Sequence, residues 1–226
     1  ANCPESQLPG PTLIVTEGDT VTVVLTNGLP AAAGNTSILF PGFQVASSGG
    51  TSGLVTQEAP SLAACNGAAG CNTVTYTFTA SSPGTHSYYS GTQGDLQIEM
   101  GLFGALVVLP KSIPANCDSG LAASNLGAKA AAGETDFRLA HAAYNNKAAC
   151  YDREYLFQFS EMDDRIHSQT EAQVLADQAK TTGGCTSPTG CLVVATEPYS
   201  PGYYMINGRS MPDDMDPNYA GQYPSQ

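Results

Sequence analysis

The chain has 226 residues, enough for one large domain or two small ones, and its 42% of hydrophobic residues excludes global disorder. Eight Lys and Arg against twenty Asp and Glu give a net charge of −12, and so acidic a surface repels phosphate backbones and anionic lipids. We therefore expect no nucleic-acid partner. Because no apolar run approaches the roughly 20 residues that span a bilayer, we also expect no membrane insertion.

The first 110 residues are typical of β-structure. Segment 73–79 alternates hydroxyl and apolar side chains, which predicts a strand with one wet and one buried face. Short strands with Gly and Pro between them and no intervening helix indicate an antiparallel sandwich or barrel. The predicted strands are 12–16, 20–26, 73–79, 86–90 and 104–109.

After Pro110 the composition changes and helices are expected. The Ala-rich segments 121–132 and 136–144 predict two helices, and a capping box at Ser168–Glu171 predicts a third that runs to Lys180. Further strands are expected at 155–159, 192–195 and 203–206, with Asn207-Gly208 as a turn. These strands are too few to close a second β-sandwich.

Seven cysteines indicate an oxidising compartment. Cys65–Cys71 and Cys185–Cys191 are both C-x5-C units whose intervening Gly, Pro and Asn residues favour tight loops, which can bring two Cα atoms within disulfide reach. Metal ligation is the alternative, although zinc sites usually use C-x2-4-C pairs. We therefore expect two disulfide-closed loops.

The remaining cysteines allow one more bridge. Cys117 and Cys150 could pair across the Ala-rich stretch, and Cys3 is then left over, either unpaired or bonded to something outside this chain. Three disulfides and few lysines favour a secreted protein, extracellular or periplasmic, and a mature chain would already have lost its signal peptide.

Three segments resemble the bacterial multicopper oxidases, which are built from cupredoxin-type β-sandwiches. They are 9–27 (PGPTLIVTEGDTVTVVLTN), 83–108 (from PGT to GLFGALVV), and 151–159 with 205–209. The resemblance implies the N-terminal portion of such an enzyme. It implies a mainly β cupredoxin-like antiparallel sandwich at 1–112, an Ala-rich helical connection at 113–150 and an incomplete second cupredoxin-like domain at 151–226.

The copper-ligand pattern of that family is altered in this chain. The resemblance places the first His-x-His pair on Leu39 and Pro41 and the second on Tyr89 and Gly91. Leu, Pro and Gly side chains cannot bind copper, and one phenol does not make a cluster. No Cys is followed closely by a His, as an electron-entry copper would require. Copper is thus the cofactor that the resemblance implies, but no complete copper site and no catalytic residue is visible.

The other ligand candidates are weaker. The three histidines, His86, His141 and His167, are far apart in the sequence and have no ligand spacing. We expect a hydrogen-bonded structural role for His86 on its strand and a surface position for His141. Two acidic groups could hold a cation through oxygen ligands, although solvated charge is the more ordinary interpretation. They are Glu161, Asp163 and Asp164 beside His167, and Asp213, Asp214 and Asp216 near the end.

Three functions remain open, of which the third, a small-molecule-binding module, has no motif in the sequence to support it. In the first, the chain is part of a secreted multicopper-oxidase-like enzyme whose copper ligands come from a missing C-terminal continuation or a partner chain. Electron transfer from substrate to oxygen then follows from the family, and activity is not expected from these residues alone. In the second, the chain is a copper-free structural or assembly module on a cupredoxin scaffold. Such a module could self-associate through open sheet edges as a homo-oligomer.

Overall fold

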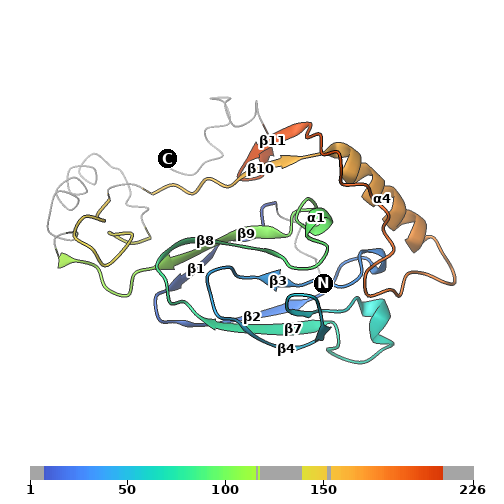
Figure 1. Cartoon of the computed structure of the whole chain (residues 1–226), viewed down its shortest axis with the longest axis horizontal. Helices are drawn as coiled ribbons and strands as arrows, with labels where there is room; N and C mark the ends of the chain where they lie inside the picture. The colour runs from blue at the N-terminus through green and yellow to red at the C-terminus, as the bar shows by residue number, and fades with distance from the viewer. Residues whose placement is uncertain (1–7, 116, 118–138, 152–153, 211–226) are drawn as a thin grey trace, which may run out of the picture.

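The computed structural model describes residues 8–115, 117, 139–151 and 154–210, which form a mainly β molecule (Figure 1). The predicted helix at 121–132, Cys3 and the acidic residues Asp213, Asp214 and Asp216 lie outside the described residues. No helix among the residues described is long and apolar enough to cross a membrane.

Two sheets face each other and form the β-sandwich (Figure 1). One has the order β1-β9-β8-β3 and the other β2-β7-β4. The strands are β1 (Leu13–Thr16), β2 (Thr20–Thr26), β3 (Ile38–Leu39), β4 (Ala46–Gly49), β7 (Thr73–Thr79), β8 (Gly84–Ser90) and β9 (Phe103–Leu109). All pairings are antiparallel except that of β1 with β9, which is parallel.

The strands form where the sequence predicts them because alternate side chains enter one core. Along β7, Val74, Tyr76 and Phe78 are buried while the threonines between them are more exposed. Phe40 packs against Phe78 with a centroid distance of 4.9 Å, and Leu106 and Val108 of β9 complete the centre. The expectation of a cupredoxin-like antiparallel sandwich is confirmed for this part of the chain.

Short elements connect the strands. They are the 3-10 helices η1 (Ala31–Ala33) and η2 (Leu62–Cys65), the hairpin strands β5 (Thr51–Ser52) and β6 (Gln57–Glu58), and α1 (Gly94–Gln97). Three disulfides are present, and they join the pairs that the sequence predicts: Cys65–Cys71, Cys117–Cys150 and Cys185–Cys191.

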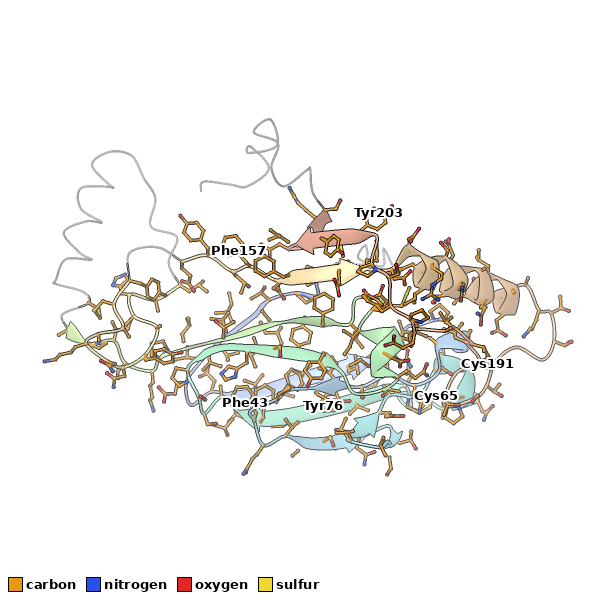
Figure 2. The ribbon with its side chains drawn as sticks, turned by 45° about the horizontal axis from the view of Figure 1, so that its top comes forward. Phe43, Cys65, Tyr76, Phe157, Cys191 and Tyr203 are labelled. Atoms are coloured by element: carbon orange, nitrogen blue, oxygen red, sulfur yellow. A yellow bond between two sulfur atoms is a disulfide. The ribbon has the colours of Figure 1, made fainter. Side chains whose placement is uncertain are left out.

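In the described part of the second half, the chain adds a small sheet and one long helix. The sheet has the order β10-β11-β12, from β10 (Phe159–Met162), β11 (Tyr203–Ile206) and β12 (Arg209–Ser210). The turn at Asn207-Gly208 is the predicted one, since both residues have positive φ (52° and 77°), as a type I′ hairpin requires. In both views β10, β11 and the helix α4 (Asp164–Gln178) lie over the β8–β9 side of the sandwich (Figures 1 and 2).

Four of the expected element boundaries are wrong. Residues 139–144 are not helical, because Ala142 and Cys150 form an antiparallel bridge beside the Cys117–Cys150 disulfide. Segment 155–159 is extended but enters the sheet only at Phe159, and 192–195 forms no strand. The helix expected from Ser168 begins one turn earlier, because Asp163 provides the N-terminal cap by accepting from Arg165 N.

Candidate functional site

Strands β3 and β8 bring together three of the four positions where the resemblance places copper ligands. Leu39 and Tyr89 are directly opposite each other in the antiparallel pair, and Gly91 follows the end of β8. Pro41 lies exposed two residues beyond Leu39. The positions that the sequence pattern groups are therefore neighbours in space, although none of the four is a histidine.

Gly91 has no room for a side chain. A Cβ atom built there would lie 2.9 Å from Leu39 Cγ and 2.9 Å from Ser37 Oγ. Leu39 has thus filled the space that a side chain at position 91 would need. This is close packing rather than an open ligand shell.

The polar groups beside these positions are bonded to one another. Thr92 Oγ1 donates to Glu58 Oε1 at 2.9 Å, and Ser37 Oγ lies 2.8 Å from Thr92 Oγ1. Asn35 Nδ2 donates to the other carboxylate oxygen of Glu58 at 3.1 Å. We call Asn35, Ser37, Glu58 and Thr92 the Glu58 network. Each carboxylate oxygen of Glu58 therefore accepts a hydrogen bond from within the network.

Gln97 of α1 extends this hydrogen bonding. Its Oε1 accepts from Thr36 Oγ1 and Ser90 Oγ, both at 2.8 Å, and its Nε2 donates to Asn35 O at 2.8 Å. Gln97 is buried, so all three bonds form away from bulk water, where an unmade hydrogen bond is costly. The result is a cross-link between β3, β8 and α1 made of neutral groups.

These residues do not fit copper. Copper prefers imidazole and thiolate ligands, and the network offers amides, hydroxyls and one engaged carboxylate. Asn35 Oδ1 is a buried acceptor without a hydrogen-bond partner among the described residues, but one amide oxygen does not build a copper site. No group of three or more His, Cys, Asp or Glu that could hold a metal occurs in the described parts of the chain.

The three histidines lie apart from one another. His86 Nε2 is 2.8 Å from Ser82 O, and its ring packs on Phe43 at 4.6 Å, which is the structural role expected for it. His141 is in the bend before Ala142, not on a helix. His167 is in α4, not in a loop before the helix, and its Nε2 lies 3.3 Å from Glu99 Oε1.

The tyrosines beside the candidate site have structural roles. Tyr88 OH donates to Pro11 O at 2.7 Å and Tyr76 OH donates to Gln57 O at 2.7 Å. Burial raises the pKa of both phenols above the usual value, so they stay protonated and keep these hydrogen bonds at neutral pH. A protonated, hydrogen-bonded phenol is a poor copper ligand.

A second polar cluster, which the sequence does not predict, joins α1 to the second half of the chain. Glu99 Oε2 accepts from Tyr199 OH at 2.8 Å, and Glu99 Oε1 accepts from Asp163 N at 2.8 Å. Burial and the adjacent Glu99 carboxylate raise the pKa of Tyr199. The cluster holds the start of α4 against the turn that follows α1, and the acidic residues 161, 163 and 164 do not form a cation site.

Asp163 is the buried charge of this cluster. Burial alone would raise its pKa, but the N–H groups of Ser200 and Arg165 and the Arg165 guanidinium together lower it below the usual value. Arg165 Nη2 lies 3.1 Å from Asp163 Oδ2. The acidic loop that the sequence offered as a cation site is therefore a helix cap with its own cation, the arginine.

Comparison with known proteins finds a family model that matches the first half of the chain. Residues 4–113 match the family model described as multicopper oxidase. No curated protein is similar enough in sequence to count as a match.

Solved structures similar to the chain include three copper oxidases. The multicopper oxidase mgLAC has a TM-score of 0.47 and 18% identity over 91% of this chain and 46% of its own. A further multicopper oxidase has a TM-score of 0.36 and 30% identity over 48% and 34%, and the blue copper oxidase of Nitrosomonas europaea has 0.45 and 19% over 91% and 46%. The chain spans less than half the length of each. With the family match and the sandwich described above, residues 4–113 are a cupredoxin-type domain of the multicopper oxidase family.

Proposed function

We propose that this chain is a copper-free scaffold within a secreted multicopper-oxidase-like protein, one whose own residues carry no complete copper site. The observation that supports the proposal most strongly is the packing at Gly91, where Leu39 fills the space of a side chain. The hydrogen bonds of the Glu58 network and of Gln97 point the same way, since they join the segment before β3, strand β6, the end of β8 and α1 without a metal.

In this proposal any oxidase chemistry belongs to residues outside the chain. Copper ligands would come from a continuation or a partner chain, and the cupredoxin domain would supply a rigid support. We further propose the domain limits 1–112, 113–150 and 151–226, in which the last part is an incomplete cupredoxin-like domain. Secretion is supported by the three disulfides, which persist in oxidising compartments.

Thermal unfolding in the presence of Cu²⁺ tests the scaffold proposal. A ligand that binds only the folded chain raises its stability by about 2.7 kcal/mol at 100 times its Kd. We expect no rise in the unfolding midpoint when copper is added. Tyr89→Phe, which removes the single ligand-capable atom at the four positions, should behave identically. A copper-dependent rise that Tyr89→Phe abolishes would refute the proposal.

A second candidate function is assembly, and an exposed row of aromatic side chains favours it. Tyr155, Phe157 and Phe159 lie at alternate positions with centroid distances of 6.2 and 6.4 Å, and Phe159 is 75% exposed. Phe157 and Tyr203 are labelled along this side of the molecule (Figure 2). Exposed apolar rows beside an edge strand are typical of contact surfaces, here with a second copy of the chain.

Light scattering tests the assembly candidate. It predicts a concentration-dependent dimer of the parent chain that Phe159→Glu weakens at least tenfold. Leu175→Glu is the matched control, because Leu175 is also exposed but lies on α4, away from the aromatic row. A parent chain that stays monomeric at high concentration would rule this candidate out.

A further inference from the structure

A cavity of about 680 Å³ lies between the sandwich and α4. Strands β1, β2, β3 and β8 contribute to one wall, and Val174 of α4 and Leu192 contribute to the other. Side chains that line it include Phe40, Tyr88, Leu96, Phe103, Val174 and Leu192. The cavity does not touch the Glu58 carboxylate, and it is separate from the four ligand positions described above.

The cavity is open to solvent at its rim, where Leu29 and Met100 are exposed, so it is a pocket and not an enclosed void in the core. Small-molecule sites in proteins occupy roughly 300–1,000 Å³ and are mostly apolar. The cavity thus has the size and the lining of a binding site.

The polar side chains in the wall are already engaged. Gln93 Nε2 donates to Ala33 O and Thr189 O at 3.2 and 2.7 Å, and Thr170 Oγ1 donates to Ile166 O at 2.8 Å. Tyr88 OH donates to Pro11 O, and the amide of Gln97 is engaged at both ends. No Lys, Arg, His, Asp or Glu is among the described residues that line the cavity. A charged ligand would therefore lose its hydration without gaining a partner.

The cavity has a buried floor and an accessible rim. Phe40 and Tyr88 belong to the core of the sandwich and are almost fully buried, while Leu29 and Met100 are 40% and 43% exposed. A ligand can thus enter past Leu29 and Met100 and contact Leu13, Val23 and Phe103, which are partly exposed. Met100 is unbranched and adapts its shape easily to an occupant.

We propose that this cavity binds one uncharged, hydrocarbon-rich small molecule, held by contact with Leu13, Val23 and Phe103 and selected against charge. Occupation removes apolar surface of both partners from water, which provides the affinity. Because the ligand contacts the core of the sandwich, binding also stabilises the folded chain. The proposal goes beyond the scaffold function and does not depend on copper.

Titration with the neutral fluorophore N-phenyl-1-naphthylamine tests the proposal. We expect saturable fluorescence enhancement at one probe per chain, with a rise in the unfolding midpoint. The anionic relative 1-anilinonaphthalene-8-sulfonate has the same rings and a sulfonate, and it should bind at least tenfold more weakly. Equal affinity for the two probes would contradict selection against charge.

Neighbouring residues of α4 provide a matched pair of variants. Val174→Phe places a ring in the cavity and should weaken probe binding at least tenfold, whereas Leu175→Phe changes an exposed position and should leave it unchanged. Ala33→Leu fills the cavity from η1 and gives an independent second variant if Val174→Phe does not fold.

Two results would overturn the proposal. One is the absence of saturable binding to the parent chain, as expected if a segment of the chain or a second copy occupies the cavity. The other is binding that neither Val174→Phe nor Ala33→Leu weakens, which would place the probe elsewhere, for example on the aromatic row at Phe157 and Phe159. Neither result bears on copper binding, so failure here is distinct from failure of the scaffold proposal.

Discussion

Gly91, at a position where the resemblance places a copper-ligand histidine, is closely packed by its neighbours. A Cβ atom at position 91 would meet Leu39 Cγ and Ser37 Oγ at 2.9 Å, just beyond the end of the strand that carries Tyr89. A side chain at position 91 therefore requires Leu39 and Ser37 to shift.

Gly91→Ala should therefore lower the free energy of unfolding by about 1–3 kcal/mol, the usual cost of adding a methylene to a filled site. Gly28→Ala is the control, because nothing lies within 4 Å of a Cβ at Gly28 and its change should stay within about 0.5 kcal/mol. Urea unfolding measures both. Equal effects of the two variants would show that position 91 is open.

Three of the four positions where the resemblance places ligands can be interpreted from the sequence alone, since Leu39, Pro41 and Gly91 have no ligating side-chain atom in any fold. The Glu58 network could not be predicted in the same way. Glu58 and Thr92 are 34 residues apart and meet only because the hairpin of β5 and β6 folds back beside β8. Long-range polar contacts of this kind leave no periodic signal in a sequence.

At the scale of elements, the sequence correctly predicts that α4 is a helix but places its start one turn too late. The capping-box pattern at Ser168 predicts a helix, but the chain starts it at Asp164, where Asp163 is held by Arg165 N, Arg165 Nη2 and Ser200 N. Two bonds from Arg165 and one from the distant Ser200 N outweigh the capping-box pattern. Strands β2 and β7, in contrast, lie where the sequence predicts them. Their side chains alternate between polar and apolar, and this local alternation determines which face of the strand is buried.

The pH dependence of stability tests the role of Asp163. Its lowered pKa means that it stabilises the fold above the unfolded-chain value of about 3.9, and that this contribution is lost as the pH falls through the lower pKa of the folded state. Asp163→Asn keeps a helix-capping side chain but removes the charge.

We expect Asp163→Asn to unfold at lower urea concentration than the parent chain at pH 7, and the difference to shrink on acidification below about pH 4. Glu171→Gln, an exposed position in the middle of α4, serves as the control with little change at any pH. A difference between Asp163→Asn and the parent that stays constant with pH would contradict the assigned charge interaction.

Two of the disulfides should differ in how much they stabilise the fold. Cys117–Cys150 spans 33 residues and Cys65–Cys71 spans 6, so the entropy of loop closure gives stabilities of about 4 and about 2 kcal/mol respectively. The variant in which Cys117 and Cys150 are both replaced by Ser should therefore be less stable than the variant in which Cys65 and Cys71 are both replaced. Chemical unfolding of both variants measures this order, and the reverse order would count against the loop-length argument.

At the scale of the whole molecule, the second half of the chain is held to the sandwich by polar contacts around Glu99 and by the walls of the cavity. Glu99 accepts from both Tyr199 and Asp163, and its side chain is 7% exposed. The sequence suggests two halves of different composition but not these contacts, since residue 99 is separated from its partners by 64 and 100 positions.

Glu99→Gln should lower the free energy of unfolding by about 1–3 kcal/mol, because one of two buried donors loses its acceptor. Glu161→Gln, an exposed carboxylate nearby, should change it by less than about 0.5 kcal/mol. Chemical denaturation compares the two variants. Similar small effects would show that the Glu99 contacts do not hold the halves together.

The most direct measurement of the central claim is the copper-to-chain ratio of the protein expressed and purified with copper present, determined by elemental analysis. A scaffold whose ligand positions are Leu39, Pro41, Tyr89 and Gly91 predicts a ratio near zero. One or more tightly bound coppers per isolated chain would contradict the account, because these residues would then form a copper site that neither their chemistry nor their packing allows.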